Sequence, residues 1–254
     1  MKQEISINSG SEKIIVSLDV PTKAEAIKLV KLIDGNAAMF KVGLELLFHE
    51  GITVIKDLIG QGAKIFLDAK FHDIPNTVAG AAKGAVRLGV HMFNVHASGG
   101  HDMMRAAVDA AKDEAARLNI HRPIILGVTI LTSIDKSTMN HQLRIPGTVE
   151  RQVVNLAIMA EKAGLDGIIA SPREIVKLRK YLSKNMLIVT PGIRPIWAAS
   201  QDQRRIMTPG EAIRNGASYI VVGRPIIKPP SEIGSPLDAA IKIAEEIAEN
   251  LRGE

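Results

Sequence analysis

The sequence predicts a single (β/α)8-barrel domain, and three observations lead to this fold class. The chain has 254 residues, 46% of them hydrophobic and 23% charged, which suits one globular domain with a sizeable core. Four segments repeat one pattern, in which a helical stretch ends at a glycine and a short apolar run follows at once. These glycines are Gly62, Gly89, Gly164 and Gly216. Each apolar run has the length of a buried parallel strand, so β and α elements alternate.

Reading the whole chain in this way gives about eight β/α units, the number in a TIM barrel. The predicted strands cover residues 14–19, 37–42, 64–69, 91–96, 124–129, 167–170, 187–190 and 219–222. The predicted helices between them include residues 22–34, 77–88, 100–117, 149–163, 173–182 and 236–251. A doubly wound open sheet is the alternative fold. It is disfavoured because no glycine-rich dinucleotide fingerprint follows the first strand.

No linker or low-complexity tract divides the chain, so we expect one domain over residues 1–254, with residues 1–12 as a loosely held extension. No apolar run approaches the length of a membrane span, and the first twenty residues contain three acidic side chains. We therefore expect a cytoplasmic protein that does not contact membranes. The absence of cysteine excludes disulfides, zinc–thiolate sites and thiol nucleophiles.

The net charge of +5 indicates a partner that carries negative charge, either a nucleic acid or a phosphate compound. Aromatic residues make up only 3% of the chain, and the basic residues are spread among the predicted helices. Single-stranded nucleic acids are bound by stacking aromatic side chains, which are scarce in this chain. We therefore expect a small anionic substrate and no nucleic acid.

Active sites of (β/α)8 barrels lie at the carboxyl ends of the strands and in the loops that follow them. The reactive residues predicted at these places are Asp19, Lys41, Asp68, Lys70, Asp73, His96, Thr132, Arg194 and Arg224.

The densest group of charges is in the segment LDAKFHDIPNT, after the third strand. Asp68 and Lys70 are two residues apart and share a face of an extended strand, Asp73 follows in the loop, and Lys41 ends the second strand. Alternating acids and lysines would pair, and a charged lysine is a poor nucleophile but a ready proton donor. This favours electrostatic catalysis with proton delivery over a Schiff base. The alternatives are a salt-bridged rim and a magnesium site at Asp68 and Asp73, which the intervening lysine disfavours.

Two further segments indicate a phosphate site: TPGIRP at the end of the seventh strand and VVGRPI at the end of the eighth. On barrels the loops after these strands often bind phosphate through glycine N–H groups and helix N-termini. Arg194 and Arg224 can each offer a planar, two-pronged donor to phosphate oxygens. The long segment after Arg194 predicts a lid over residues 193–207 that closes on bound phosphate.

These motifs together resemble the orotidine 5′-phosphate decarboxylase family, whose members convert orotidine 5′-monophosphate (OMP) into uridine 5′-monophosphate (UMP). The motifs are LDV at Asp19, KVG at Lys41, LDAKFHDIPNT, VTILTS, TPGIRP, DQRR and VVGRPI, and the resemblance runs from about residue 14 to residue 244. DAKFHDIPNT is highly specific, whereas VGRPI occurs in many phosphate-binding barrels. The resemblance implies a (β/α)8 barrel that needs no metal and no cofactor.

The resemblance also implies a role for individual residues. Asp19 would bind a ribose hydroxyl, and Lys41 would bridge the ribose and the charged network. Asp68 would lie beside the carboxylate of the substrate, and Lys70 would protonate C6 as carbon dioxide leaves.

Asp73 and Thr77 resemble residues that reach into the site of a neighbouring subunit, which implies a homodimer. Thr132 or the adjacent Ser133 would contact the pyrimidine. The implied phosphate binders are Gln203, Gly223 and Arg224, with Arg194 beside them. The resemblance gives His96 no direct chemical role, and we interpret it as structural.

Two rival functions share parts of this pattern. A sister enzyme acting on keto-sugar or hexulose phosphates has a similar D-x-K-x-x-D motif but needs magnesium; the IPNT and DQRR segments favour the nucleotide enzyme. A barrel that binds phosphometabolites without catalysis is the second rival, and the intact Asp68, Lys70 and Asp73 set disfavours it.

Overall fold

The computed structural model describes residues 7–198 and 207–252. Within them, eight strands form one closed barrel in the order β1-β2-β3-β4-β5-β6-β7-β8, which confirms the predicted fold class. The chain divides into two compact units, residues 1–68 with 190–254 and residues 69–189. The single-domain organisation stays a prediction.

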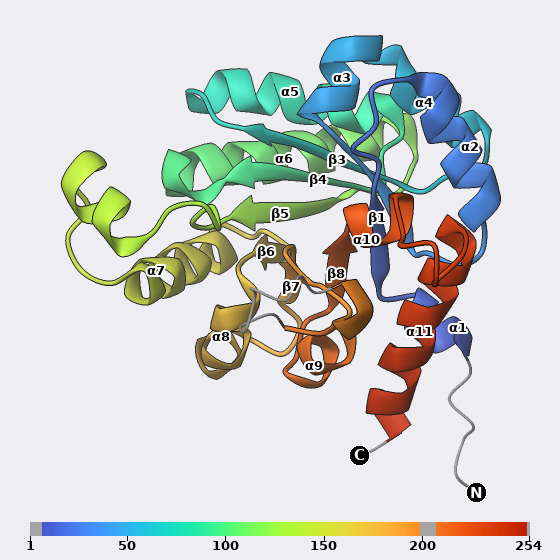
Figure 1. Ribbon diagram of the computed structural model, residues 1–254. Coiled ribbons are helices and arrows are strands. Elements are labelled where there is room, and N and C mark those ends of the chain that lie inside the picture. The colour runs from blue at the N-terminus through green and yellow to red at the C-terminus, as the bar shows by residue number, and fades with distance from the viewer. Residues whose placement is uncertain (1–6, 199–206, 253–254) are drawn as a thin grey trace, which may run out of the picture. The chain divides into compact units, whose positions relative to one another are not determined.

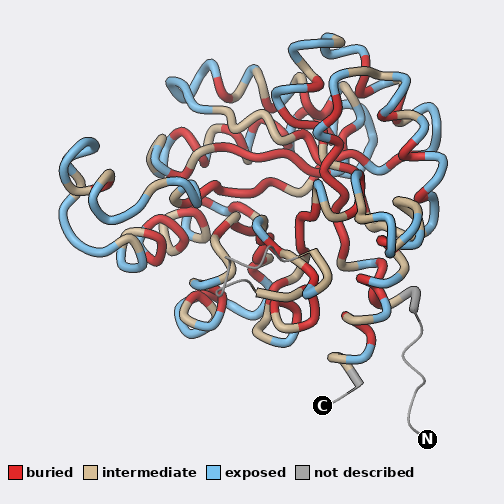
Figure 2. Tube along the Cα trace, in the orientation of Figure 1, coloured by how far each residue is buried: buried red, intermediate tan, exposed pale blue. Residues whose placement is uncertain are grey.

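The first unit contains the strands nearest the two ends of the chain. β1 pairs in parallel with both β2 and β8, and β2 pairs in parallel with β3. These strands are β1 (Ile14–Ser17), β2 (Met39–Gly43), the first part of β3 (Ile65–Phe71) and β8 (Tyr219–Val222). Every residue of β1 is buried, as Figure 2 shows in red, because a strand of a closed barrel has helices over one face and the barrel interior at the other.

The helices of the first unit cover these strands. They are α1 (Ile7–Ser11), α2 (Lys23–Ile33), α3 (Leu44–Glu50), α4 (Thr53–Gly60), η4 (Ile196–Ala198), α9 (Pro209–Arg214), α10 (Arg224–Ile227) and α11 (Pro236–Arg252). Side chains cap several of them: Thr22 accepts a hydrogen bond from the Glu25 amide, and Thr208 and Glu211 form a capping box at the start of α9.

The structure describes residues 7–12 of the segment expected to be a loosely held extension, and that expectation stays a prediction. Residues 7–11 form α1, which packs against α11, the red helix beside it in Figure 1. Gly10 is buried, and a Cβ there would lie only 2.0 Å from the carbonyl oxygen of Ala244. Only glycine permits so close an approach of two backbones, so this contact fixes the described part of the segment.

The second unit contains the middle of the chain. β4 (Met92–His96), β5 (Ile124–Val128), β6 (Gly167–Ile169) and β7 (Leu187–Thr190) pair in parallel in that order. The helical elements of this unit are α5 (Pro75–Leu88), η1 (Ala97–Gly99), α6 (His101–Leu118), η2 (Thr138–Gln142), α7 (Val149–Lys162), η3 (Pro172–Glu174) and α8 (Ile175–Tyr181).

An ion cluster joins α5 to α6 in this second unit. The Glu114 side chain is only 4% exposed, and its carboxylate accepts hydrogen bonds from Arg87 Nε at 2.5 Å and from Arg117 Nη2 at 2.7 Å. These two guanidinium groups, Arg117 first, lower the pKa of Glu114 to about 2. The cluster keeps a nearly buried carboxylate ionised between two packed helices.

The predicted glycine helix stops are confirmed, because all four glycines have left-handed backbones. Their φ angles are 88° at Gly62, 78° at Gly89, 85° at Gly164 and 106° at Gly216.

The main differences lie at element ends. β1 ends at Ser17, two residues before the predicted end, and the predicted helix over 173–182 is divided into η3 and α8. None of the helices within residues 7–198 and 207–252 has the length and apolar character that a membrane span requires.

Candidate functional site

In the first unit, a lysine and two carboxylates lie on or just beyond the carboxyl-terminal parts of β1, β2 and β3. Lys41 Nζ lies 3.3 Å from Asp19 Oδ1 and 3.3 Å from Asp68 Oδ2. The Lys41 and Asp68 side chains are 12% and 13% exposed, whereas Asp19 is 47% exposed. Solvent screens the half-exposed pair more strongly, so the contact with Asp68 contributes more to holding the ammonium. Of the predicted pairs of acids and lysines, the one between Lys41 and Asp68 is present.

The carboxylate of Asp19 has two oxygens with different surroundings. Oδ1 accepts a hydrogen bond of 2.8 Å from the hydroxyl of Ser17 and also contacts Lys41. Oδ2 lies toward Gly223, where an added Cβ would come within 3.2 Å of it. Two donors therefore fix one oxygen, and the absence of a side chain at Gly223 leaves the space beside the other.

Gly43 has no side chain, and this leaves room for the ammonium of Lys41. A Cβ at this position would lie 2.8 Å from Lys41 Nζ, closer than a Cβ approaches a non-bonded atom in real structures. Its φ of −101° is ordinary, so the backbone does not require glycine here. What requires glycine is the position of the ammonium.

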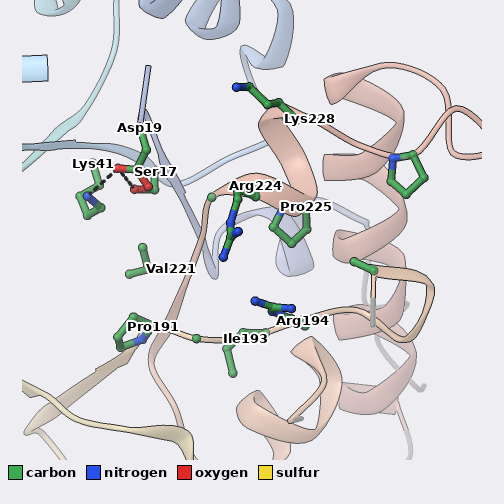
Figure 3. Close-up of a pocket in the computed structure, with 14 residues that line it drawn as sticks. Ser17, Asp19, Lys41, Pro191, Ile193, Arg194, Val221, Arg224, Pro225 and Lys228 are labelled. Atoms are coloured by element: carbon green, nitrogen blue, oxygen red, sulfur yellow. Dashed lines mark hydrogen bonds and ion pairs between the residues drawn. The ribbon is translucent and has the colours of Figure 1, made fainter. Parts of the chain in front are cut away.

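Asp19 and Lys41 line one side of a cavity of about 450 Å³ within the first unit, as Figure 3 shows. Arg194 and Arg224 line the other side, and their guanidinium groups point into the same space. Asp19 is the one carboxylate among the described residues that line the cavity. A cavity in which cations outnumber carboxylates suits an anionic ligand, and paired guanidinium groups suit a phosphate.

The predicted lid over residues 193–207 begins and ends at one point of the first unit. The amide of Arg194 donates a 3.2 Å hydrogen bond to the carbonyl of Met207, which closes the base of the loop. Gln203, predicted to bind phosphate, and the rest of residues 199–206 lie outside the described residues. Lid closure stays a prediction.

Lys70 has an unusual backbone. Its φ is +51°, in the left-handed region that residues with a Cβ rarely adopt. The face-sharing argument for Asp68 and Lys70 assumed an extended strand, so it does not hold at this residue. The Lys70 amide donates a 2.7 Å hydrogen bond to Oδ1 of Asn94, a fully buried side chain on β4.

The other predicted residues of the second unit lie on exposed segments. Asp73 is exposed and accepts a 2.6 Å hydrogen bond from the Ile74 amide at the start of α5, and exposed Thr77 lies in the first turn of that helix. Thr132 and Ser133 are exposed in the turn that follows β5. The described contacts do not decide which of these two hydroxyls faces a ligand.

His96, interpreted from sequence as structural, ends β4 and packs against another histidine. Its ring centroid lies 5.3 Å from that of His72, with the planes tilted by 37°. The ring contact ties the loop after β3 to β4, in keeping with a structural role.

Sequence reasoning missed two side chains that orient the charged groups, Ser17 and Asn94. Both are polar residues within apolar strands, IIVS and MFNVH, and both are buried. A polar residue at a buried strand position must find a hydrogen-bond partner, which was the available signal. Among the residues that the structure describes, no three His, Asp or Glu side chains gather as metal ligands would.

The sequence and the fold of this chain are similar to those of known proteins. The family model described as "Orotidine 5'-phosphate decarboxylase / HUMPS family" matches residues 12–233. An orotidine 5′-phosphate decarboxylase of Moorella thermoacetica is 49% identical over 245 residues, 96% of each chain, and one of Heliobacterium modesticaldum is 44% identical over 242 residues, 95% of this chain and 98% of the relative. A crystal structure of that enzyme from Lactobacillus acidophilus superimposes with a TM-score of 0.80 at 39% identity, covering 92% of this chain and 98% of the other.

Proposed function

The chain belongs to the orotidine 5′-phosphate decarboxylase / HUMPS family, and from this premise we propose that it converts OMP into UMP and carbon dioxide without a metal or cofactor. The observation that carries the proposal is the cavity of the first unit, with Asp19 and Lys41 on one side and two arginines on the other. That arrangement supports a ligand with a sugar hydroxyl at one end and a phosphate at the other.

The cavity chemistry fits a nucleoside monophosphate in detail. Arg194 and Arg224 offer paired donors to the phosphate, and Asp19 Oδ2 borders the space where a ribose hydroxyl would donate. The volume of about 450 Å³ is within the range of small-ligand sites, roughly 300–1,000 Å³. Gly223 supports the assignment, because a side chain there would crowd Asp19.

In the proposed mechanism, the bond between C6 and the carboxylate breaks, and the electron pair stays on C6, where no adjacent carbonyl delocalises it. The ammonium of Lys70 lies beside the developing negative charge, so its attraction is greater in the transition state than in the substrate complex and lowers the barrier. Lys70 then donates a proton to C6 as carbon dioxide leaves, and solvent returns a proton to the lysine. Asp68 and Asp73 hold the charged network in place, with Lys41 anchored by Asp68.

We further propose that the protein acts as a homodimer in the cytoplasm, with Asp73 and Thr77 contributing to the partner's site. Ile74, between them in sequence, is 67% exposed, which supports a surface covered by another chain. A second apolar group supports the same state: Leu44 and Phe48, one helical turn apart on α3, are 49% and 86% exposed. Sedimentation across a dilution series, with activity measured in parallel, tests the dimer; full activity as a monomer contradicts it.

The test of the function is the ultraviolet absorbance of OMP mixed with the purified protein in excess EDTA, because loss of the carboxylate changes the pyrimidine spectrum. A change to the UMP spectrum is the expected result. No change with EDTA, followed by activity on a keto-sugar phosphate once magnesium is restored, assigns the protein to the sister enzymes of the family. UMP binding without turnover under either condition assigns a binding function.

A further inference from the structure

We propose that Asn94 is a positioning residue for Lys70, acting through the backbone of the lysine; this inference rests on the proposed function. Asn94 lies in the middle of β4 between Phe93 and Val95, and all three are fully buried. Its Oδ1 accepts the Lys70 amide at 2.7 Å. A buried amide at this place requires such a partner, because an unsatisfied polar group in an apolar core is unfavourable.

The hydrogen bond matters because the Lys70 backbone is not in its preferred conformation. A residue with a Cβ is unfavourable at a φ of +51° and persists there only when its surroundings hold it. In a regular parallel ladder, a strand amide donates to a backbone carbonyl of the neighbouring strand. The Lys70 amide donates to a side-chain oxygen on the neighbouring strand β4.

β4 holds the residues after Lys70 as well, within the same unit. The Phe71 ring packs against Phe93 with centroids 5.9 Å apart, and the His72 ring packs against His96 at 5.3 Å. These ring contacts fix residues 71 and 72, whereas the Asn94 hydrogen bond fixes residue 70 itself. Loss of the acceptor therefore removes a constraint on the peptide from which the lysine side chain branches.

The expected consequence is a loss in turnover and not in binding. Displacement of a reacting group by about 1 Å costs on the order of 100-fold in rate. Asn94→Leu removes the acceptor and keeps the branching of the side chain at Cγ, although leucine is the larger residue, so we expect kcat to fall by about 100-fold with the KM for OMP and the affinity for UMP within about threefold of the native values. Asn94→Asp retains an oxygen at the same position and is expected to recover most of kcat.

The matched control is Asp166→Ala. Asp166 Oδ2 accepts the Ile125 amide at 2.7 Å, a side chain-to-backbone hydrogen bond of the same length in the same unit but at the start of β5. This variant loses the same kind of bond and, in addition, the ion pair of Asp166 with Arg122 at 2.6 Å, so its stability falls at least as much. We nevertheless expect its kcat to be unchanged. Equal losses of kcat in Asp166→Ala and Asn94→Leu would mean that general destabilisation explains the effect, and the positioning role would be abandoned.

Amide hydrogen exchange at Lys70 in the native protein tests the inference without any variant or substrate. We expect a slowly exchanging Lys70 amide that becomes fast in Asn94→Leu and stays slow in Asn94→Asp. A fast amide in the native protein overturns the proposal, as does native kcat in Asn94→Leu, or loss of kcat in Asn94→Asp with the amide still protected. Absence of OMP turnover in the native protein is a different result, which refutes the proposed function. The exchange measurement then still tests whether the Asn94 side chain protects the Lys70 amide.

Discussion

Replacement of Gly43 by alanine tests whether the position of the Lys41 ammonium, and not its presence, controls activity. The added Cβ would lie 2.8 Å from Nζ, whereas ordinary van der Waals contact begins at 3.4 Å. The ammonium must therefore move by about 0.6 Å or more, because the lysine tip is the flexible partner of this contact. The ammonium could then no longer keep its present position between the two carboxylates, each now 3.3 Å away.

The cost of this displacement is expected in catalysis more than in folding. A φ of −101° is open to alanine, so the backbone is not strained. We expect kcat/KM for OMP to fall by about 10- to 100-fold, equivalent to about 1.4–2.7 kcal/mol. The free energy of unfolding should change by no more than about 1 kcal/mol, because the flexible lysine can yield.

Steady-state OMP decarboxylation and urea unfolding of the same preparations supply the two measurements. Gly60→Ala is the control, since nothing lies within 4 Å of a Cβ at that exposed end of α4, and its activity should match the native protein. Activity of Gly43→Ala within about twofold of native would refute the argument, since that is less than about 0.5 kcal/mol. A loss of several kcal/mol in stability would also refute it, by showing that the fold itself needs the glycine.

Three further predictions address other parts of the molecule. Lys70→Ala should remove nearly all turnover while UMP still binds in calorimetry; retention of turnover within tenfold, a barrier change of only ~1.4 kcal/mol, would show that the assigned role is wrong. Ser17→Ala should raise the KM for OMP by about three- to tenfold with little change in kcat, because it removes one donor, worth roughly 0.5–1.5 kcal/mol, from Asp19; an unchanged KM would contradict this. The pKa of the Glu114 carboxylate is lowered from 4.5 to about 2, so its contribution to the free energy of unfolding should be complete above pH 4.5 and lost as the pH falls toward 2. Urea titrations of Glu114→Gln should lack this pH dependence, and a profile equal to that of the native protein would refute the prediction.

The fold followed from sequence because its determinants are local and repeated. A glycine that ends a helix and an apolar run that follows it depend only on neighbouring residues, so Gly62, Gly89, Gly164 and Gly216 could be placed without any tertiary information. Element ends were less predictable. Ser17 ends β1 although Leu18 is buried and its amide still donates to the Lys41 carbonyl of β2, because the end of a strand is defined only to within one or two residues.

The charged side chains of the candidate site could be predicted from the sequence, whereas the residues that orient them could not. Lys41 and Asp68 could be placed at one rim because both lie toward the carboxyl ends of parallel strands that are neighbours in a barrel. The conformation of Lys70 could not, because nothing in LDAKF signals a left-handed residue, and its hydrogen-bond acceptor lies 24 residues further along the chain. Backbone strain at a non-glycine residue depends on tertiary contacts that hold it, and those contacts have no local signature.

The unequal exposure of the two carboxylates around Lys41 suggests how one network can be both rigid and able to bind. At 13% exposure, Asp68 faces the ammonium with little competing water, so this pair anchors the lysine. At 47% exposure, Asp19 is stabilised less by the same 3.3 Å contact with Lys41. Its carboxylate can therefore still accept a hydrogen bond from a ligand. Ser17 then becomes decisive, because its hydroxyl fixes Oδ1 and leaves Oδ2 at the cavity edge beside Gly223. A carboxylate oriented in advance loses little entropy when a ribose hydroxyl donates to it, so the uncharged neighbours of this site should set its affinity as strongly as its charges do.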